Sequence, residues 1–239
     1  EDGALAAMVP EMPPLPNGER SLLVAGTLAE LVEDQLSRLL EALGVGAVHF
    51  FPPRSSRRLP PLGTRTSVLL AQPFLGRTAR ALAARGAEIL AAPYPIGVEG
   101  TRAWLKAAAD AWGVPARRLA EATAAPAARA ERGLERYREV LAGKRISFFP
   151  DSELELPMAR FLQRECGMRV VEVASPRLDR ELLRAELDLL PGGARVVEGG
   201  DLEQQLERVR AQRPDLTVCG LGLANPLEAE GLTTKWSIE

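Results

Sequence analysis

Short apolar runs alternate with longer amphipathic segments along most of this 239-residue chain. Runs of strand length occur at residues 21–26, 48–51, 67–71 and 89–92, and the segments between them carry apolar residues at helical spacing. Strands that alternate with helices are joined by right-handed crossovers, which make the strands of one sheet parallel. This part of the chain is therefore predicted to fold as an α/β unit.

The same pattern starts again at residue 144 and predicts a second unit. Its expected strands are residues 145–149, 169–174, 195–198 and 216–220, with helices after residue 151 and near residues 179–190 and 201–212. The predicted fold class is α/β, with tandem Rossmann-like three-layer αβα units that each contain a parallel sheet.

Composition divides the rest of the chain. Residues 1–20 are rich in proline and show little periodicity, which predicts a linker or a strap over another domain. Residues 21–114 and 144–239 are the two Rossmann-like domains, the second one truncated at its C-terminal end. Residues 115–143 are rich in alanine and arginine and are interrupted by Pro126. Because glutamates lie between the arginines, this segment is predicted to be a helical connector with a solvated face rather than an anion site.

Two helix starts carry the spacing of a capping box. Thr27 with Glu30 and Ser152 with Glu155 each place a hydroxyl three residues before a carboxylate. The acidic side chains from Asp151 to Glu155 are more simply explained by the positive end of a helix dipole than by a catalytic carboxylate pair.

The bulk charge excludes some partners. The net charge of −2 comes from 30 basic and 32 acidic residues, so no general field favours nucleic acid.

The apolar runs stop well short of the roughly 20 residues that a membrane helix needs. The N-terminus also lacks the pattern of a secretory signal. A cytoplasmic location without nucleic-acid or membrane partners is expected.

Cysteine and histidine are scarce. Cys166 and Cys219 are the two cysteines, and they are far apart and outside any CxxC pair. Both are predicted to be reduced and buried. His49 is the single histidine and lies in a strand-like run, which favours a structural role. A zinc hydrolase or a Ser-His-Asp enzyme would need more such residues, so the chain is predicted to hold no catalytic residue and no metal ligand.

The last 24 residues run from a strand into a glycine turn. Gly220 and Gly222 can turn the backbone after the strand, and Asn225 with Pro226 fits the N-cap and first position of a helix. Open α/β sheets place ligands at such a turn. A further strand begins near residue 233, and the chain ends without a turn behind it. The sequence therefore predicts a piece of a longer protein.

This turn does not predict a nucleotide site. Residues 220–225 read GxGxxN, which lacks the third glycine of the dinucleotide fingerprint, and GxxxxGK[ST] does not occur in the chain. Lys235 and Trp236 are more suggestive, because an apolar aromatic near glycines suits a flat ligand and a lysine can meet a carboxylate. Plain core packing is the competing interpretation of Trp236.

Five runs of the chain carry a family resemblance. They are EDGALAAMVP at residues 1–10, LLAQPFLG at 69–76, GVEGTRAWLKAAADAWGV at 97–114, FFPDSELELPMARFL at 148–162 and TVCGLGLANPLEAEGLTTKWSIE at 217–239. In this order they resemble the N subunits of light-independent (dark-operative) protochlorophyllide reductase, within the nitrogenase component 1-like superfamily. The resemblance covers essentially the whole chain.

The resemblance implies an enzyme that reduces the C17=C18 bond of protochlorophyllide to give chlorophyllide in (bacterio)chlorophyll biosynthesis. In that family two N and two B subunits form an N2B2 heterotetramer. A 4Fe–4S cluster lies between N and B, and a separate ATP-hydrolysing iron–sulfur protein, L, delivers the electrons. The implied partners of this chain are therefore the B subunit, the L protein and protochlorophyllide.

The chain departs from the family pattern at the cluster. The three N-subunit cluster cysteines belong to a domain that would precede Glu1, and Cys166 and Cys219 do not match them. The chain is therefore similar to the second and third of three domains and is expected to be inactive alone. The resemblance also implies that this chain forms part of the wall of the substrate cleft. The residues expected there are Gly220, Leu221, Gly222, Leu223, Asn225, Pro226, Lys235 and Trp236.

Two other interpretations remain open at this stage. One is an assembly scaffold for a nitrogenase-type metallocofactor. The other is a stand-alone module of two Rossmann-like lobes that binds a small molecule. Three suitably spaced cysteines encoded upstream of Glu1 would support the reductase subunit, and a start codon at Glu1 would support the binding module.

Overall fold

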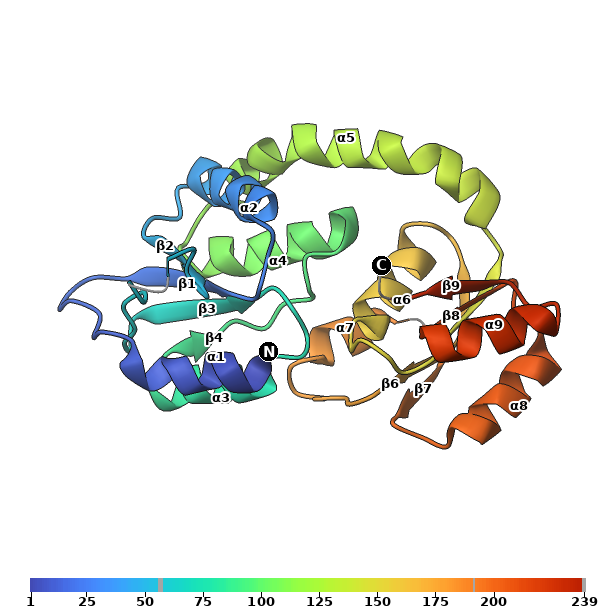
Figure 1. Ribbon diagram of the computed structural model, residues 1–239. Helices are drawn as coiled ribbons and strands as arrows, with labels where there is room; N and C mark the ends of the chain where they lie inside the picture. Colours follow the sequence, from blue (N-terminus) through green and yellow to red (C-terminus); the bar gives the residue numbers. More distant parts are fainter. Residues whose placement is uncertain (56–57, 191, 238–239) are drawn as a thin grey trace. The chain divides into compact units, whose positions relative to one another are not determined.

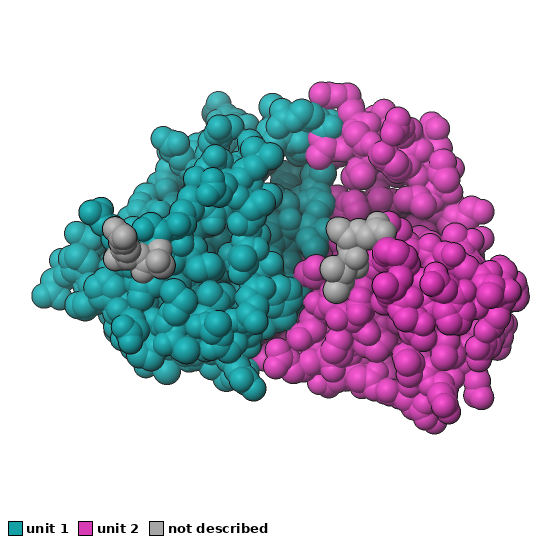
Figure 2. All heavy atoms as spheres, viewed as in Figure 1, with its two compact units in different colours: residues 1–129 teal, residues 130–239 magenta. Residues whose placement is uncertain are grey.

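Two parallel sheets organise the computed structural model, which describes residues 1–55, 58–190 and 192–237 (Figure 1). The chain divides into two units, Glu1–Arg129 and Ala130–Glu239, coloured separately in Figure 2. The division falls inside the segment predicted to be a connector. The α/β class and the parallel sheets are confirmed.

Unit 1 is built on the strands β1 (Ser21–Ala25), β2 (Val48–Phe51), β3 (Thr66–Leu70) and β4 (Glu88–Ile89). Their order across the sheet is β2-β1-β3-β4, and every pair is parallel. All residues of β1 and β3 are buried, because helices cover both faces of the sheet. This burial explains why the strands read as continuous apolar runs in the sequence.

Helices α2 (Glu30–Leu43) and α4 (Gly97–Ala111) cover one face of this sheet, and α1 (Asp2–Met8) and α3 (Gly76–Ala84) lie on the other (Figure 1). Trp104 of α4 is fully buried, and its indole N–H donates to the carbonyl of Leu70 at 2.8 Å. The large aromatic side chain thus fills the core without leaving its polar atom unpaired.

The segment predicted to be an irregular linker contains helix α1 and the 3-10 helix η1 (Val9–Glu11). Leu5 and Val9 are buried. The Asp2 carboxylate accepts the backbone N–H groups of Arg77 and Thr78 at the start of α3, at 2.9 and 2.8 Å. The prediction of irregular structure is corrected here. A helix of seven residues that buries one side chain leaves little periodicity to detect.

The capping box predicted at Thr27 and Glu30 is wrong. Helix α2 begins at Glu30 with Ala29 as its N-cap and with no side-chain cap. The backbone N–H of Thr27 instead donates to Gln72 Oε1 at 2.8 Å, and its hydroxyl donates to Glu1. Thr27 is held by the loop after the neighbouring strand, so it is not free to cap its own helix.

Helix α5 (Ala116–Leu141) runs through Pro126 without a break and spans the division between the units. A proline within a helix removes one backbone hydrogen bond. The sequence predicted an interrupted connector with no core residues. Leu119 is nevertheless buried in the core of unit 1, so the start of α5 belongs to that core.

Unit 2 contains the strands β5 (Arg145–Phe148), β6 (Arg169–Ser175), β7 (Arg195–Glu198), β8 (Leu216–Cys219) and β9 (Thr234–Trp236). They are parallel in the order β7-β6-β5-β8-β9. The strand expected after residue 233 is β9, and residues 238–239 lie outside the described part of the chain.

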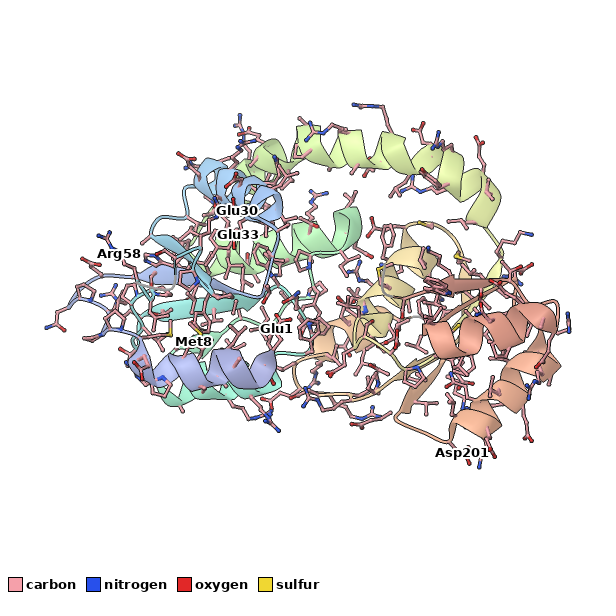
Figure 3. All side chains as sticks on the ribbon, viewed as in Figure 1. Glu1, Met8, Glu30, Glu33, Arg58 and Asp201 are labelled. Atoms are coloured by element: carbon pink, nitrogen blue, oxygen red, sulfur yellow. The ribbon has the colours of Figure 1, made fainter. Side chains whose placement is uncertain are left out.

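The helices of unit 2 are α6 (Glu155–Arg164), α7 (Arg184–Leu189), α8 (Leu202–Gln212) and α9 (Leu221–Ala229). Helix α8 starts where predicted, because Asp201 accepts the N–H groups of Glu203 and Gln204 (Figure 3). Helix α7 starts later than predicted. The Asp179 side chain accepts the N–H of Leu182, which favours a turn before the helix.

A membrane span is not found among the described helices, none of which is both long and apolar enough to cross a bilayer.

Candidate functional site

The strand order of unit 2 reverses between β5 and β8. The chain moves from β5 outward to β6 and β7, then returns to the other side of β5 to form β8 and β9. The loops that follow β5 and β8 therefore meet at the carboxyl end of the sheet. Ligands of open α/β sheets bind at such a reversal, so this edge is the candidate site.

Helix α9 begins directly after β8, which corrects the predicted helix start. Gly220 is the N-cap and Leu221 is the first helical residue, so Asn225 and Pro226 lie inside the helix. Gly222 is also helical rather than part of a turn. The missing N–H of Pro226 removes one hydrogen bond of α9, which nevertheless continues to Ala229.

The predicted substrate residues differ in exposure. Leu221 is 57% exposed and Trp236 is 39% exposed, which is unusual for large apolar side chains. Trp236 lies beside Cys219 in the register of β8 and β9, so both exposed side chains belong to the carboxyl end of neighbouring strands. Lys235 is exposed too, and strand geometry turns it to the opposite face from Trp236.

The remaining predicted residues lie along α9. Gly222, Asn225 and Pro226 are exposed, whereas Leu223 is half-buried against the core of unit 2. The edge of the sheet therefore gathers Gly220, Leu221 and Trp236, whereas Lys235 lies on the other face of β9 and the remaining predicted positions lie along α9.

A buried carboxylate organises the loop after β5. Glu155 is 2% exposed, and its Oε1 accepts the backbone N–H groups of Asp151, Ser152 and Glu153 at 2.8, 2.6 and 3.2 Å. Its Oε2 accepts the hydroxyl of Ser175, at the end of β6, at 2.8 Å. Both carboxylate oxygens are thus used, and the loop is tied to the neighbouring strand.

The same contacts exclude a phosphate from this loop. In dinucleotide-binding folds, backbone N–H groups after the first strand hold the pyrophosphate. Here the Glu155 carboxylate takes three such N–H groups. A phosphate placed there would have to displace a buried anion that is already hydrogen-bonded. The hydrogen bonding of this loop therefore does not suit the phosphates of NAD or ATP at the carboxyl end of β5.

The capping box predicted at Ser152 and Glu155 is wrong in its geometry. Helix α6 starts at Glu155 with Leu154 as its N-cap. The spacing did reveal a carboxylate that bonds back to preceding backbone N–H groups. Its bond to Ser175, 20 residues away in the sequence, left no local signal.

Asp151 joins three loops at this edge. Its carboxylate accepts the hydroxyl of Ser237, which follows β9. A Cβ atom on Gly220 would lie 3.0 Å from Asp151 Oδ1 and 3.4 Å from Cγ. Gly220 has a negative φ of −69°, so what glycine provides here is room beside the Asp151 carboxylate and not an unusual backbone angle.

The cysteines do not form a metal site. Cys166 and Cys219 are free and buried, as predicted. Burial raises the pKa of both thiols. The pKa of Cys219 rises to about 11, and the nearby carboxylates of Asp151 and Glu228 contribute to this rise. A raised pKa disfavours the thiolate that binds iron. Within residues 1–55, 58–190 and 192–237, no group of three or more His, Cys, Asp or Glu side chains could hold a metal.

His49 lies in unit 1, beside a groove of about 530 Å³ between α2 and the segment that follows β2. The groove is bordered by Glu33 and by Arg54, whose Nε donates to Glu33 Oε2 at 2.6 Å. Burial lowers the pKa of His49, which favours the neutral imidazole. The structural role of this histidine stays a prediction.

Comparison with known proteins gives a consistent result. A family model described as nitrogenase component 1 type oxidoreductase matches residues 2–233. The chain is 61% identical over 239 residues to the light-independent protochlorophyllide reductase subunit N of Halorhodospira halophila. It is 59% identical to the corresponding subunit of Rhodopseudomonas palustris (strain BisB5). Both matches cover 100% of this chain and 56% of the relative.

Solved structures show the same fold. A nitrogenase described as Cp1, solved at pH 5, matches with a TM-score of 0.69 at 15% identity, covering 99% of this chain and 55% of that chain. The structure of nitrogenase Cp1 at pH 6.5 gives a TM-score of 0.65 at 18% identity, covering 98% of this chain and 57% of that one. The chain thus spans little more than half the length of the proteins that it matches.

Proposed function

The chain belongs to the nitrogenase component 1 type oxidoreductases, and we propose that it forms part of the N subunit of a light-independent protochlorophyllide reductase. The observation that carries the proposal is 61% identity, over the full length of this chain, to a subunit N of that enzyme. The proposed reaction is the reduction of the C17=C18 bond of protochlorophyllide to give chlorophyllide.

The proposed role of the chain is to build part of the substrate cleft and to support it. A magnesium tetrapyrrole is flat, apolar on both faces and acidic at its edge, so it needs a large apolar wall. Leu221 and Trp236 supply exposed apolar surface at the carboxyl end of the unit 2 sheet. Lys235 is also exposed, on the other face of β9, and is a proposed contact for the acidic edge of the ligand. Gly222, Leu223, Asn225 and Pro226 remain proposed contacts along α9.

The cluster of the proposed enzyme does not fit the described residues of this chain. The described residues lack a group of three metal-binding side chains, and burial raises the pKa of both thiols, which disfavours the thiolate form. We therefore place the 4Fe–4S cluster on other parts of the complex, and we assign ATP hydrolysis to the separate L protein. The proposed partners are a B subunit, in an N2B2 heterotetramer, and the L protein.

An activity assay tests this proposal. The product of the complete gene, purified together with its partner subunits, is incubated in the dark with protochlorophyllide, ATP, a reductant and the L protein. Formation of chlorophyllide, followed by its absorbance, supports the proposal. Failure to form chlorophyllide, while an authentic reductase complex converts the same substrate in a parallel reaction, refutes it.

A further inference from the structure

The loop after β5 has a backbone conformation that needs support. Glu153 has a φ of +63°, in the left-handed region that residues other than glycine seldom adopt. Such conformations persist where the surrounding structure over-determines them. Here the surroundings are the Glu155 carboxylate, which accepts the N–H of Glu153 and of the two residues before it.

A carboxylate suits this position for a chemical reason. Converging backbone N–H groups form a concave site for an anion. Glu155 provides one oxygen to the three N–H groups and the other to the hydroxyl of Ser175. Glutamine would keep one acceptor for the N–H groups and could donate its amide to Ser175, but it would lack the charge that strengthens these hydrogen bonds. Alanine would leave the N–H groups without a partner.

The effect of Glu155 extends to the candidate site through Asp151. The Glu155 carboxylate accepts the backbone N–H of Asp151 and so holds the backbone there. The Asp151 carboxylate accepts the hydroxyl of Ser237 and lies close beside Gly220. Gly220 directly precedes Leu221, and Ser237 directly follows Trp236. The two exposed apolar side chains of the edge are therefore each adjacent to a residue that Asp151 contacts.

We propose that Glu155 is a positioning residue for the substrate: it holds the loop after β5 so that Asp151 sets the spacing between the start of α9 and the end of β9. It acts through Asp151 and does not contact the ligand, because it is buried. This inference rests on the proposed function, since it assigns Glu155 to the same tetrapyrrole-binding edge.

The test uses three variants of the complete protein, assembled with its partner subunits. Glu155→Ala removes the carboxylate, Glu155→Gln keeps its shape, and Glu172→Gln is the matched control. Glu172 is a buried carboxylate of the same unit, on β6, but it pairs with Arg208 at 2.7 Å and does not contact the loop after β5. The readouts are KM for protochlorophyllide, kcat and the thermal midpoint.

We expect Glu155→Ala to raise KM by about tenfold or more, since several hydrogen bonds that shape the site are lost. Glu155→Gln should recover most of that loss. The control should lower the thermal midpoint while KM stays within about twofold of wild type, because it changes stability without moving the loop. A KM for Glu155→Ala as close to wild type as that of the control would overturn the inference.

A second variant reaches Asp151 from the other side. Gly220→Ala adds a Cβ that would press on the Asp151 carboxylate while Glu155 stays intact. If both changes act by moving Asp151, their effects on KM in the double variant are less than additive, because the two sites are coupled. Additive effects would contradict the shared route through Asp151.

The outcomes separate this inference from the proposed function. If the wild-type complex reduces protochlorophyllide but substitution of Glu155 leaves KM unchanged, the inference alone fails. If the wild-type complex does not reduce protochlorophyllide, the proposed function fails and the inference falls with it.

Discussion

Arg160 and Glu186 form a fully buried ion pair in unit 2, with Arg160 Nε 2.8 Å from Glu186 Oε2 and both side chains 0% exposed. The pair joins α6 to α7. A second carboxylate, Glu165, lies 3.3 Å from Arg160 Nη1 and is 8% exposed. Two buried acids thus share the guanidinium of Arg160.

Replacing Arg160 alone should therefore lower the free energy of unfolding more than replacing Arg160 together with its two acidic partners. Arg160→Met removes the guanidinium that Glu186 and Glu165 contact in the core and should lower the free energy of unfolding by about 3 kcal/mol or more. The triple variant Arg160→Met/Glu165→Gln/Glu186→Leu, which removes the buried charges together, should recover part of this loss. Urea titration of the purified protein measures both. An Arg160→Met variant as stable as wild type would contradict the importance of the pair.

The exposed apolar edge predicts a change in substrate affinity without a change in stability. Leu221→Ala and Trp236→Ala should each raise KM for protochlorophyllide several-fold. The reason is that each substitution removes apolar contact with the ligand worth roughly 1 kcal/mol or more. Their thermal midpoints should stay close to wild type, because both side chains are exposed in the structure. Steady-state kinetics of the assembled complex provides the measurement.

Leu202→Ala is the matched control for Leu221→Ala. Leu202 is the first residue of α8, as Leu221 is of α9, and it is 43% exposed, but it follows the edge strand β7. The KM of the Leu202→Ala variant for protochlorophyllide should equal that of wild type. Equal effects at the two leucines would show that the edge beside β8 has no special part in binding.

Burial of Cys219 predicts a loss of stability at alkaline pH. The folded-state pKa of about 11 lies above the ordinary thiol value of 9.0, so the folded protein holds this proton more tightly than the unfolded chain. The resulting stabilisation is present below pH 9 and is lost as the pH rises toward 11. Urea titrations at pH 8 and pH 10.5 should show a smaller decrease for Cys219→Ala than for wild type. An identical decrease would mean that Cys219 does not titrate as the structure implies.

Asp2 should stabilise unit 1 from a distance of more than 70 residues in the sequence. It accepts the N–H groups of Arg77 and Thr78 at the start of α3. Asp2→Ala should cost about 1 kcal/mol, the usual effect of losing a helix cap, and Asp2→Asn should retain part of the stability. Chemical denaturation tests this, and equal stability of the alanine variant would contradict the cap.

The sheet strands could be predicted because each strand carries its own local signal. β1 and β3 are buried along their whole length, so each appears as a short run dominated by apolar residues. The parallel direction of the strands also followed from the rule that strand-helix-strand units form right-handed crossovers. These signals were sufficient for the fold class.

The helix caps and the organisation of the site could not be predicted in the same way. Thr27 is held by Gln72 and Glu155 by Ser175, contacts that join residues 45 and 20 positions apart. Capping rules consider only neighbouring residues, and they misplaced both helix starts. Asn225 and Pro226 show the same limit. Their local pattern suited a helix start, but α9 begins earlier, with Gly220 as its N-cap and Asp151 close beside it.

A structure of the assembled complex with bound protochlorophyllide tests the central claim most directly, which is that the carboxyl edge of unit 2 forms part of the tetrapyrrole cleft. The account predicts that the ring contacts Leu221 or Trp236. A ring bound entirely against other surfaces, with both side chains still exposed to solvent, would contradict it.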